Sequence, residues 1–174
     1  MKTINVLVAV LTVAAGLLAS NATAQDAAAV PPAPVKKGMT WTKSATDPVS
    51  GVVTVGCYNC DPYKGDTPCT TPLPLLCIRK SGPGFPLPLP AGLNNSDQYN
   101  KWAGGVIATT APTAAPATVT AADAACVAAF GTDWRLAEFH DGWGWHFRAY
   151  GGVGNPTGKV WAHVNDQPAG TCFH

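Results

Sequence analysis

The chain is poor in charge and carries almost no excess of either sign. Only 12% of its 174 residues are charged, with 11 Lys and Arg against 10 Asp and Glu. A near-neutral chain gives no electrostatic reason to bind nucleic acid or an anionic membrane surface. We therefore expect neither as a partner, and the sequence predicts no cofactor.

Motifs of the common hydrolases are also missing. The sequence contains no G-x-S-x-G turn for a serine nucleophile and no H-E-x-x-H pair for a catalytic zinc. Glu138 and Asp141 are a carboxylate pair to consider for glycoside cleavage, although two carboxylates this close in a strand-to-loop segment are common. The favoured interpretation is a protein that is not an enzyme, with a small secreted hydrolase as an alternative.

Long apolar runs are missing except near the start of the chain. Residues 6–18 are apolar and uncharged, and small residues follow at 22–24. Because the run is shorter than the ~20 residues that span a bilayer, we predict a signal peptide over residues 1–24, cleaved before Gln25, rather than a retained anchor. Its removal takes away Lys2 and leaves ten charges of each sign. No later run is long enough to span a membrane, so a secreted or periplasmic protein is predicted.

Cysteine, in contrast, is present in an even number. The six cysteines are Cys57, Cys60, Cys69, Cys77, Cys126 and Cys172. In an exported chain such a count indicates disulfides, and we predict that no thiol is free. The alternatives are a zinc knot from the first four cysteines and a redox pair at Cys57 and Cys60. The ligand-like gap is not repeated at Cys69 and Cys77, and no βαβ pattern surrounds the pair, so disulfides are favoured.

The remaining pattern predicts one small α+β domain, stabilised by disulfides, with mostly short antiparallel strands and one Ala-rich helix. Residues 25–38 are rich in Ala and Pro and predict a linker, so the domain is expected to cover residues 39–174. Residues 82–92 carry prolines at alternate positions, which predicts either a rigid connector or a surface offered to a partner. Strands are expected at residues 51–58, 73–80, 102–110, 134–139, 145–150 and 159–164.

The helix is expected over residues 120–131. Thr120 can cap its N-terminus, with Asp123 three residues later, and Gly131 can end it in the left-handed conformation. One face of this helix is expected to point inward, and its residues are Ala122, Cys126 and Phe130.

Two of the expected strands, residues 145–150 and 159–164, alternate apolar and polar side chains, and we expect them to pair as an antiparallel hairpin. The side expected to face the core carries Trp145, Phe147, Ala149, Val160, Ala162 and Val164. The other side is the candidate ligand-binding surface, formed by His146, Arg148, Tyr150, Trp161 and His163. Aromatic rings beside polar groups suit sugars, peptides and small polar ligands, and Arg148 is expected over the ring of Trp161. The alternatives are an ordinary solvated sheet surface and a surface covered by the Pro-rich segment.

Histidines and a carboxylate in the same region raise the question of zinc. The residues concerned are His140, Asp141, His146 and His163. Their spacing is not that of a tight metal motif, so we predict no metal site.

The C-terminal block, residues 130–173, contains "FGTDWRLAEFHDGWGW" and "VWAHVNDQPAGTCF". Together with "CYNCDPYKGDTPC" it resembles small exported bacterial proteins of no assigned function, which implies a shared domain and no activity. More distantly, it is similar to C-type-lectin-like domains, in which an Ala-bearing helix with a cysteine leads into a Leu-Ala strand, here Leu136 and Ala137. Residues 161–166 resemble the W-I-G-L-N-D-like strand of that family.

The lectin-like resemblance also implies a disulfide pairing. The helix cysteine of that family pairs with a C-terminal cysteine, which implies a bridge between Cys126 and Cys172 and leaves the four clustered cysteines to pair among themselves. The family's Glu-Pro-Asn and Trp-Asn-Asp calcium signatures are absent, so the resemblance implies no calcium ligands.

The function predicted from these features is that of an exported binding domain, with a glycan or another cell-surface molecule as its partner. The alternatives are a structural protein of the envelope or matrix without a small ligand and the small secreted hydrolase.

Overall fold

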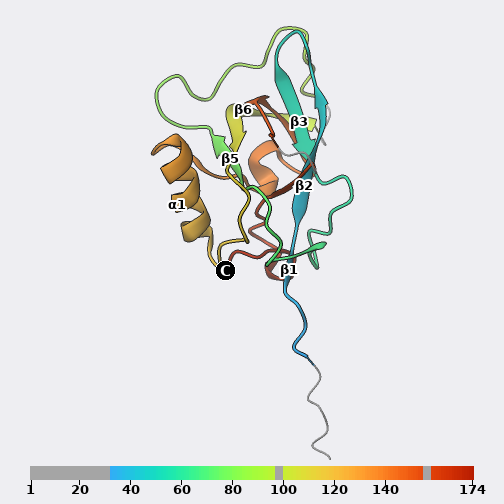
Figure 1. Cartoon of the computed structure of the whole chain (residues 1–174). Helices are drawn as coiled ribbons and strands as arrows, with labels where there is room; N and C mark the ends of the chain where they lie inside the picture. Colours follow the sequence, from blue (N-terminus) through green and yellow to red (C-terminus); the bar gives the residue numbers. More distant parts are fainter. Residues whose placement is uncertain (1–31, 97–99, 155–157) are drawn as a thin grey trace, which may run out of the picture. The chain divides into compact units, whose positions relative to one another are not determined.

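A computed structural model of the chain describes residues 32–96, 100–154 and 158–174 (Figure 1). The predicted signal peptide, residues 1–24, and the first part of the predicted linker lie outside the described residues. Pro34–His174 form one compact unit. In chain order the elements are β1 (Lys37–Gly38), β2 (Thr40–Thr46), β3 (Val52–Gly56), β4 (Thr67–Pro68), β5 (Leu76–Arg79), β6 (Asn100–Thr109), α1 (Val119–Phe130), β7 (Arg135–Leu136), the 3-10 turn η1 (Phe139–Gly142), β8 (His146–Gly151), β9 (Lys159–Trp161) and the 3-10 turn η2 (Pro168–Gly170).

Most of the strands belong to one seven-stranded sheet in the order β7-β5-β6-β8-β3-β2-β9, while β1 and β4 form a separate two-stranded sheet. Within the large sheet β6 and β8 run parallel, and the other neighbours are antiparallel. The prediction of a small, disulfide-stabilised α+β domain with mostly short strands is confirmed, and α1 is the α-helix of the described residues.

The central part of the sheet has apolar residues on both faces, as β5 illustrates. Leu76 and Ile78 belong to one buried cluster, which also contains Phe147. Cys77, between them in the sequence, belongs to a second cluster that contains Ala122 and other residues facing α1. Side chains of a strand alternate between faces, so a continuous apolar run such as that of β5 is expected where both faces are covered. Figure 1 shows α1 beside β5.

Helix α1 begins earlier than the sequence predicts. Thr118, rather than Thr120, is its N-cap, and the hydroxyl of Thr118 accepts a hydrogen bond from the backbone N–H of Ala121 at 3.1 Å. Asp123 has a different role from the expected capping contact, because its carboxylate accepts from the backbone N–H of Leu136 at 2.8 Å and so ties the helix to β7. Gly131 does end the helix, with φ 109° and ψ 173°, outside the left-handed helical region.

All six cysteines are paired, but the bridges are not those that the lectin-like resemblance implies. The pairs are Cys57–Cys60, Cys69–Cys172 and Cys77–Cys126. Cys126 does point inward from α1, as expected, and it meets the side of β5 that carries Cys77. Cys172 instead meets Cys69, which lies directly after β4.

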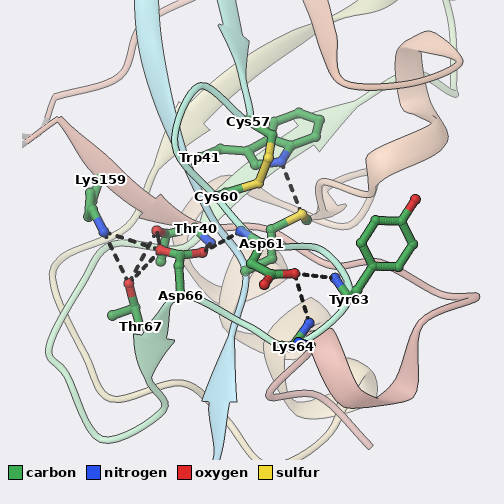
Figure 2. Close-up of a disulfide and its surroundings, with 11 residues drawn as sticks. Thr40, Trp41, Cys57, Cys60, Asp61, Tyr63, Lys64, Asp66, Thr67 and Lys159 are labelled. Carbon is green, nitrogen blue, oxygen red and sulfur yellow. Dashed lines mark hydrogen bonds and ion pairs between the residues drawn. A yellow bond between two sulfur atoms is a disulfide. The ribbon is translucent and has the colours of Figure 1, made fainter.

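Asp66 connects the cysteine-rich loop to the strands beside it, as Figure 2 shows. Asp66 accepts hydrogen bonds from the backbone N–H of Thr40 at 2.9 Å and from the hydroxyl of Thr67 at 2.8 Å, and Lys159 lies 3.1 Å from its carboxylate. Burial alone would raise the pKa of Asp66, but these hydrogen bonds outweigh it and hold the pKa below its usual value. The loop therefore joins β2, β4 and β9. The adjacent β1 starts at Lys37, within the segment predicted to be linker.

Strands β8 and β9 do not form the predicted hairpin. Strand β8 lies between β6 and β3, while β9 pairs with β2 at the edge of the sheet. The predicted core side is largely correct, because Phe147, Val160 and Val164 are buried. The predicted exposure of Trp161 is wrong, since its exposed fraction is 0%. Trp161 belongs to a buried cluster with Leu75 and the C-terminal Phe173, whereas the sequence predicted Arg148 as its neighbour across the hairpin.

Candidate functional site

Three residues of the predicted binding surface lie together on β8. His146, Arg148 and Tyr150 are half-buried and share the side of the strand opposite the core. The ring of Tyr58 lies 4.2 Å from that of His146, and the ring of Trp102 lies 5.2 Å from that of Tyr150, measured between centroids. This side of β8 is therefore an aromatic and polar surface, although its members differ from the predicted set.

The Pro-rich segment lies against β6, and Asn94, just after it, contacts β8. The backbone N–H of Leu87 donates to the carbonyl of Gly104 at 2.7 Å, and the indole of Trp102 donates to the carbonyl of Leu87 at 2.8 Å. Arg148 donates to the carbonyl of Asn94, not to the ring of Trp161. The residue that contacts Arg148 is thus Asn94, just after the Pro-rich segment.

Trp161 and His163 lie elsewhere. His163 forms backbone hydrogen bonds with Ala137, before η1, and with Phe139, the first residue of η1. Its imidazole lies 3.1 Å from the hydroxyl of Thr171. Burial lowers the pKa of His163 below its ordinary value and outweighs the opposing charge of Glu138. The structure thus separates these two side chains from His146, Arg148 and Tyr150.

The residues considered for zinc have separate surroundings. His140 lies 2.8 Å from the carboxylate of Glu138 and 3.8 Å from that of Asp166, whereas the ring of His146 lies against Tyr58. Within residues 32–96, 100–154 and 158–174, no group of three or more His, Cys, Asp and Glu side chains is arranged to hold a metal ion.

Glu138 and Asp141, the carboxylate pair considered for hydrolysis, hold the η1 turn together. The carboxylate of Asp141 accepts from the backbone N–H of Glu138 at 2.8 Å, and that of Glu138 accepts from the backbone N–H of His140 at 2.8 Å. Such a reciprocal capping box satisfies the free N–H groups at the start of a turn. The contacts of both carboxylates therefore support a structural role for this pair.

Asp141 also organises two cations. Its side chain is 3% exposed and contacts both terminal nitrogens of Arg135, one of them at 3.0 Å, and the ammonium of Lys80 at 3.2 Å. Lys80 additionally donates to the backbone carbonyl of Asp141 at 2.8 Å. Burial works against the charged form of Arg135. The hydrogen bonds and the charge of Asp141 outweigh this effect and raise the pKa of Arg135 above its usual value. Asp141 thereby fixes the positions of two long, otherwise flexible side chains.

These two cations line a surface hollow with a volume of about 380 Å³. It lies where the turn after β5 meets the turn between α1 and β7, and its lining residues are Lys80, Ser81, Thr132, Asp133, Trp134 and Arg135. The lining residues carry hydroxyls, a carboxylate, an ammonium, a guanidinium and an indole, so the hollow offers both hydrogen-bond donors and acceptors and an aromatic residue. Its volume falls within the ~300–1,000 Å³ that small-molecule sites commonly have.

The rim of the hollow is held by a further ion pair. Arg79 lies 3.3 Å from the carboxylate of Asp133, and its guanidinium lies over the ring of Phe85 at 4.6 Å from the centroid. The ring of Trp134 lies 5.0 Å from that of Phe130, at the end of α1. The polar and aromatic groups of the hollow are therefore positioned before any ligand arrives.

Sequence reasoning did not find this hollow. Its two turns lie about 50 residues apart and are brought together by the pairing of β5 with β7, in which Ile78 lies opposite Arg135. The available signal was the clustering of Thr132, Asp133 and Trp134 directly after a predicted helix. In the sequence such a cluster looks like an ordinary turn, because the segment that lies beside it in space is not known.

A second hollow is much smaller, with a volume of about 50 Å³. Its lining residues are Pro62, Tyr63, Phe139, Val164, Asp166 and Gln167. It is too small to enclose a ligand of ordinary size.

No family model, curated protein or solved structure significantly matches this chain. Among the described residues, no helix is long and apolar enough to cross a bilayer. The three disulfides are typical of proteins that fold in an oxidising compartment. The hollow and the β8 face are the two candidate sites of this protein.

Proposed function

We propose that this protein is an exported binding domain that holds a glycan in the hollow around Trp134. The observation that carries the proposal is the composition of that hollow, which is lined by hydrogen-bond donors, acceptors and a tryptophan within about 380 Å³. A sugar presents hydroxyls that both donate and accept, and the C–H groups of its ring suit an aromatic face. The hollow thus offers groups complementary to both parts of a sugar.

The charges around the hollow favour a neutral ligand. Arg79 is paired with Asp133, and Lys80 and Arg135 share Asp141. The pKa of Arg135 also reflects the negative charges of Asp123 and Glu138 nearby. Because opposite charges are close to balance, the hollow gives no electrostatic reason to select an anion or a cation. A neutral glycan is the ligand class that fits this balance.

Export is supported by the N-terminal sequence and by the disulfides. The predicted signal peptide would direct the chain out of the cytoplasm, and the three bridges suit the compartment that it would reach. A glycan of a cell surface or of the surrounding matrix is a ligand that such a protein would meet.

The alternatives make different predictions. A structural protein of the envelope or matrix needs no preformed hollow and would bind no soluble glycan. A hydrolase would require Glu138 and Asp141 to act on a substrate, whereas both carboxylates are engaged in capping η1, and Asp141 is also paired with Arg135. A binding domain agrees best with these contacts.

The test is a glycan array probed with the refolded or secreted, fully oxidised protein. Wild type is expected to bind, and Asp133→Asn and Thr132→Ala are expected to weaken binding about tenfold or more by removing hydrogen-bond partners of the ligand. Both positions are exposed, so the melting temperature should change little.

Matched variants on the β8 face distinguish the two candidate surfaces. His146→Ala, Arg148→Ala and Tyr150→Phe should leave binding unchanged if the hollow is the site. Loss of binding in these variants, with full binding by Asp133→Asn, would move the site to the β8 face. An array on which wild type binds nothing would refute the proposal and favour a structural role.

A further inference from the structure

Trp143 combines high exposure with an unfavourable backbone conformation. Its exposed fraction is 81%, the largest of any aromatic side chain among the exposed hydrophobic residues of the described chain. Its φ is 67° and its ψ 25°, in the left-handed region, and among the described non-glycine residues it alone has a positive φ. Glycine and asparagine adopt this conformation readily, whereas a bulky residue there is an outlier. Packing does not account for a tryptophan at this position, because most of the ring lies in solvent.

The turn that carries Trp143 is held firmly against the core. Gly142 lies so close to Phe147 that a β-carbon at position 142 would be 2.1 Å from the β-carbon of Phe147. The backbone N–H of Trp143 donates to the carbonyl of His140 at 3.1 Å, which closes η1. The backbone that presents Trp143 is therefore fixed in advance, which reduces the backbone entropy lost on binding.

The same turn is joined to the hollow. Lys80 donates to the carbonyl of Asp141 at 2.8 Å, and Arg135 contacts the carboxylate of Asp141. Trp143 follows Asp141 by two residues, so their Cα atoms lie within about 7 Å of each other. Trp143 is thus two residues from the side chain that holds both cations of the hollow.

We propose that Trp143 is a second stacking surface of the same binding site, so that the ligand is an oligosaccharide rather than a single sugar. The hollow around Trp134 holds one sugar ring, and Trp143 contacts another ring of the same chain. This inference rests on the proposed function, because it extends the site around Trp134. It also gives a reason for tryptophan at a position where the backbone favours glycine.

The experiment compares chain lengths by calorimetric titration of the oxidised full-length mature protein. The probes are the monosaccharide and the hexasaccharide of the cello-, chito- and malto-oligosaccharide series. Wild type is expected to bind the hexasaccharide of one series at least about tenfold more tightly than the monosaccharide. Trp143→Gly should reduce this gain by about tenfold and leave monosaccharide affinity unchanged, because only the outer contact is lost.

Stability measurements separate binding from folding. Since glycine accepts the left-handed conformation, Trp143→Gly should melt at a temperature no lower than wild type. Tyr63→Ala is the matched control, because Tyr63 is also an exposed aromatic residue, at 57%, but belongs to the cysteine-rich loop. It should keep both affinities. A fall of several degrees in the melting temperature of Trp143→Gly would instead identify Trp143 as a structural residue and overturn the inference.

The outcomes for the two proposals differ. If the hexasaccharide binds no better than the monosaccharide, or if Trp143→Gly keeps the full gain, the second contact is refuted while the hollow remains a binding site. If no probe of the three series binds wild type, the proposed neutral-glycan function fails, and the role of Trp143 fails with it.

Discussion

Asp66 is the residue whose ionisation matters most for the cysteine-rich loop. Its carboxylate connects Thr40, Thr67 and Lys159, and it accepts these bonds fully only when ionised (Figure 2). Removing the charge while keeping the shape, as in Asp66→Asn, should lower the melting temperature at neutral pH because buried donors lose part of their acceptor.

The pH dependence of this effect has a definite sign. The pKa of Asp66 is lower in the folded protein than its usual value of about 3.9. As the pH falls below about 4, the unfolded chain takes up the proton first, so stability is complete above this pH and decreases below it. The difference in melting temperature between wild type and Asp66→Asn should therefore be largest above pH ~5 and should shrink in acid. Melting curves recorded across this range give the result, and Asp166→Asn, at an exposed position, serves as the control. A difference in melting temperature that grows in acid would contradict a lowered pKa of Asp66 in the folded protein.

Trp161 and Trp143 are opposite cases of one residue type. Trp161 is fully buried among Leu75, Cys172 and Phe173, whereas Trp143 is mostly in solvent. Trp161→Ala should lower the free energy of unfolding by about 3–5 kcal/mol, as expected for truncation of a buried aromatic ring. Trp143→Ala should change it by less than about 0.5 kcal/mol, as is usual at the surface. Urea unfolding of the two variants measures both values, and a stable Trp161→Ala variant would show that its ring is not in the core.

At the scale of elements, the start of α1 can be located by mutation. Thr118→Ala removes the hydroxyl that accepts from Ala121, and it should cost about 1 kcal/mol of stability. Thr120→Ala lies within the first turn and should have almost no effect, or should stabilise slightly through the higher helix propensity of alanine. Thermal melts of this pair decide between the two N-caps. Equal losses would mean that neither hydroxyl caps the helix.

How far the sequence predicts the elements depends on whether the information is local. The strands around Val53, Ile78 and Ile107 were predicted from short β-branched and apolar runs, and their buried positions in β3, β5 and β6 agree. Strand β2 was missed because most of Thr40–Thr46 is polar and exposed. The predicted pairing of β8 with β9 was wrong. Strand β9 instead pairs with β2, which lies more than 100 residues away in the sequence. No local pattern carries this information.

The candidate site, too, was predictable only where the information is local. Alternation correctly placed His146, Arg148 and Tyr150 on one side of β8, since a strand imposes this period by itself. It failed for Trp161, because the side that it assigned to solvent is covered by the C-terminal segment. The hollow requires β5 and β7 to be adjacent, and the left-handed conformation of Trp143 is seen only in the structure.

For the whole molecule, the disulfides differ greatly in the length of chain that they close. The separations are 103 residues for Cys69–Cys172, 49 for Cys77–Cys126 and 3 for Cys57–Cys60. In the chain-entropy model, replacing both cysteines of either long-range bridge by serine should cost about 4–5 kcal/mol, against about 1–2 kcal/mol for the short one. Denaturation of the three double-serine variants tests this order.

Peptide mapping of the oxidised protein tests the pairing itself. Digestion should release one linked peptide pair containing Cys69 and Cys172 and another containing Cys77 and Cys126. A peptide pair joining Cys126 to Cys172 would contradict the structure and restore the pairing implied by the lectin-like resemblance.

The bridge between Cys69 and Cys172 also determines how the molecule would respond to mechanical tension. His174 donates to the carbonyl of Ala117 beside the start of α1, and Figure 1 shows the C-terminus at this place. A pull applied there passes within two residues to Cys172 and then through the covalent bridge to Cys69. The chain between these cysteines, which contains the hollow and Trp143, is bypassed. A load between the two ends of the chain then extends only the residues before Cys69 and after Cys172, so tension of this kind leaves the chain that forms the hollow and carries Trp143 unloaded.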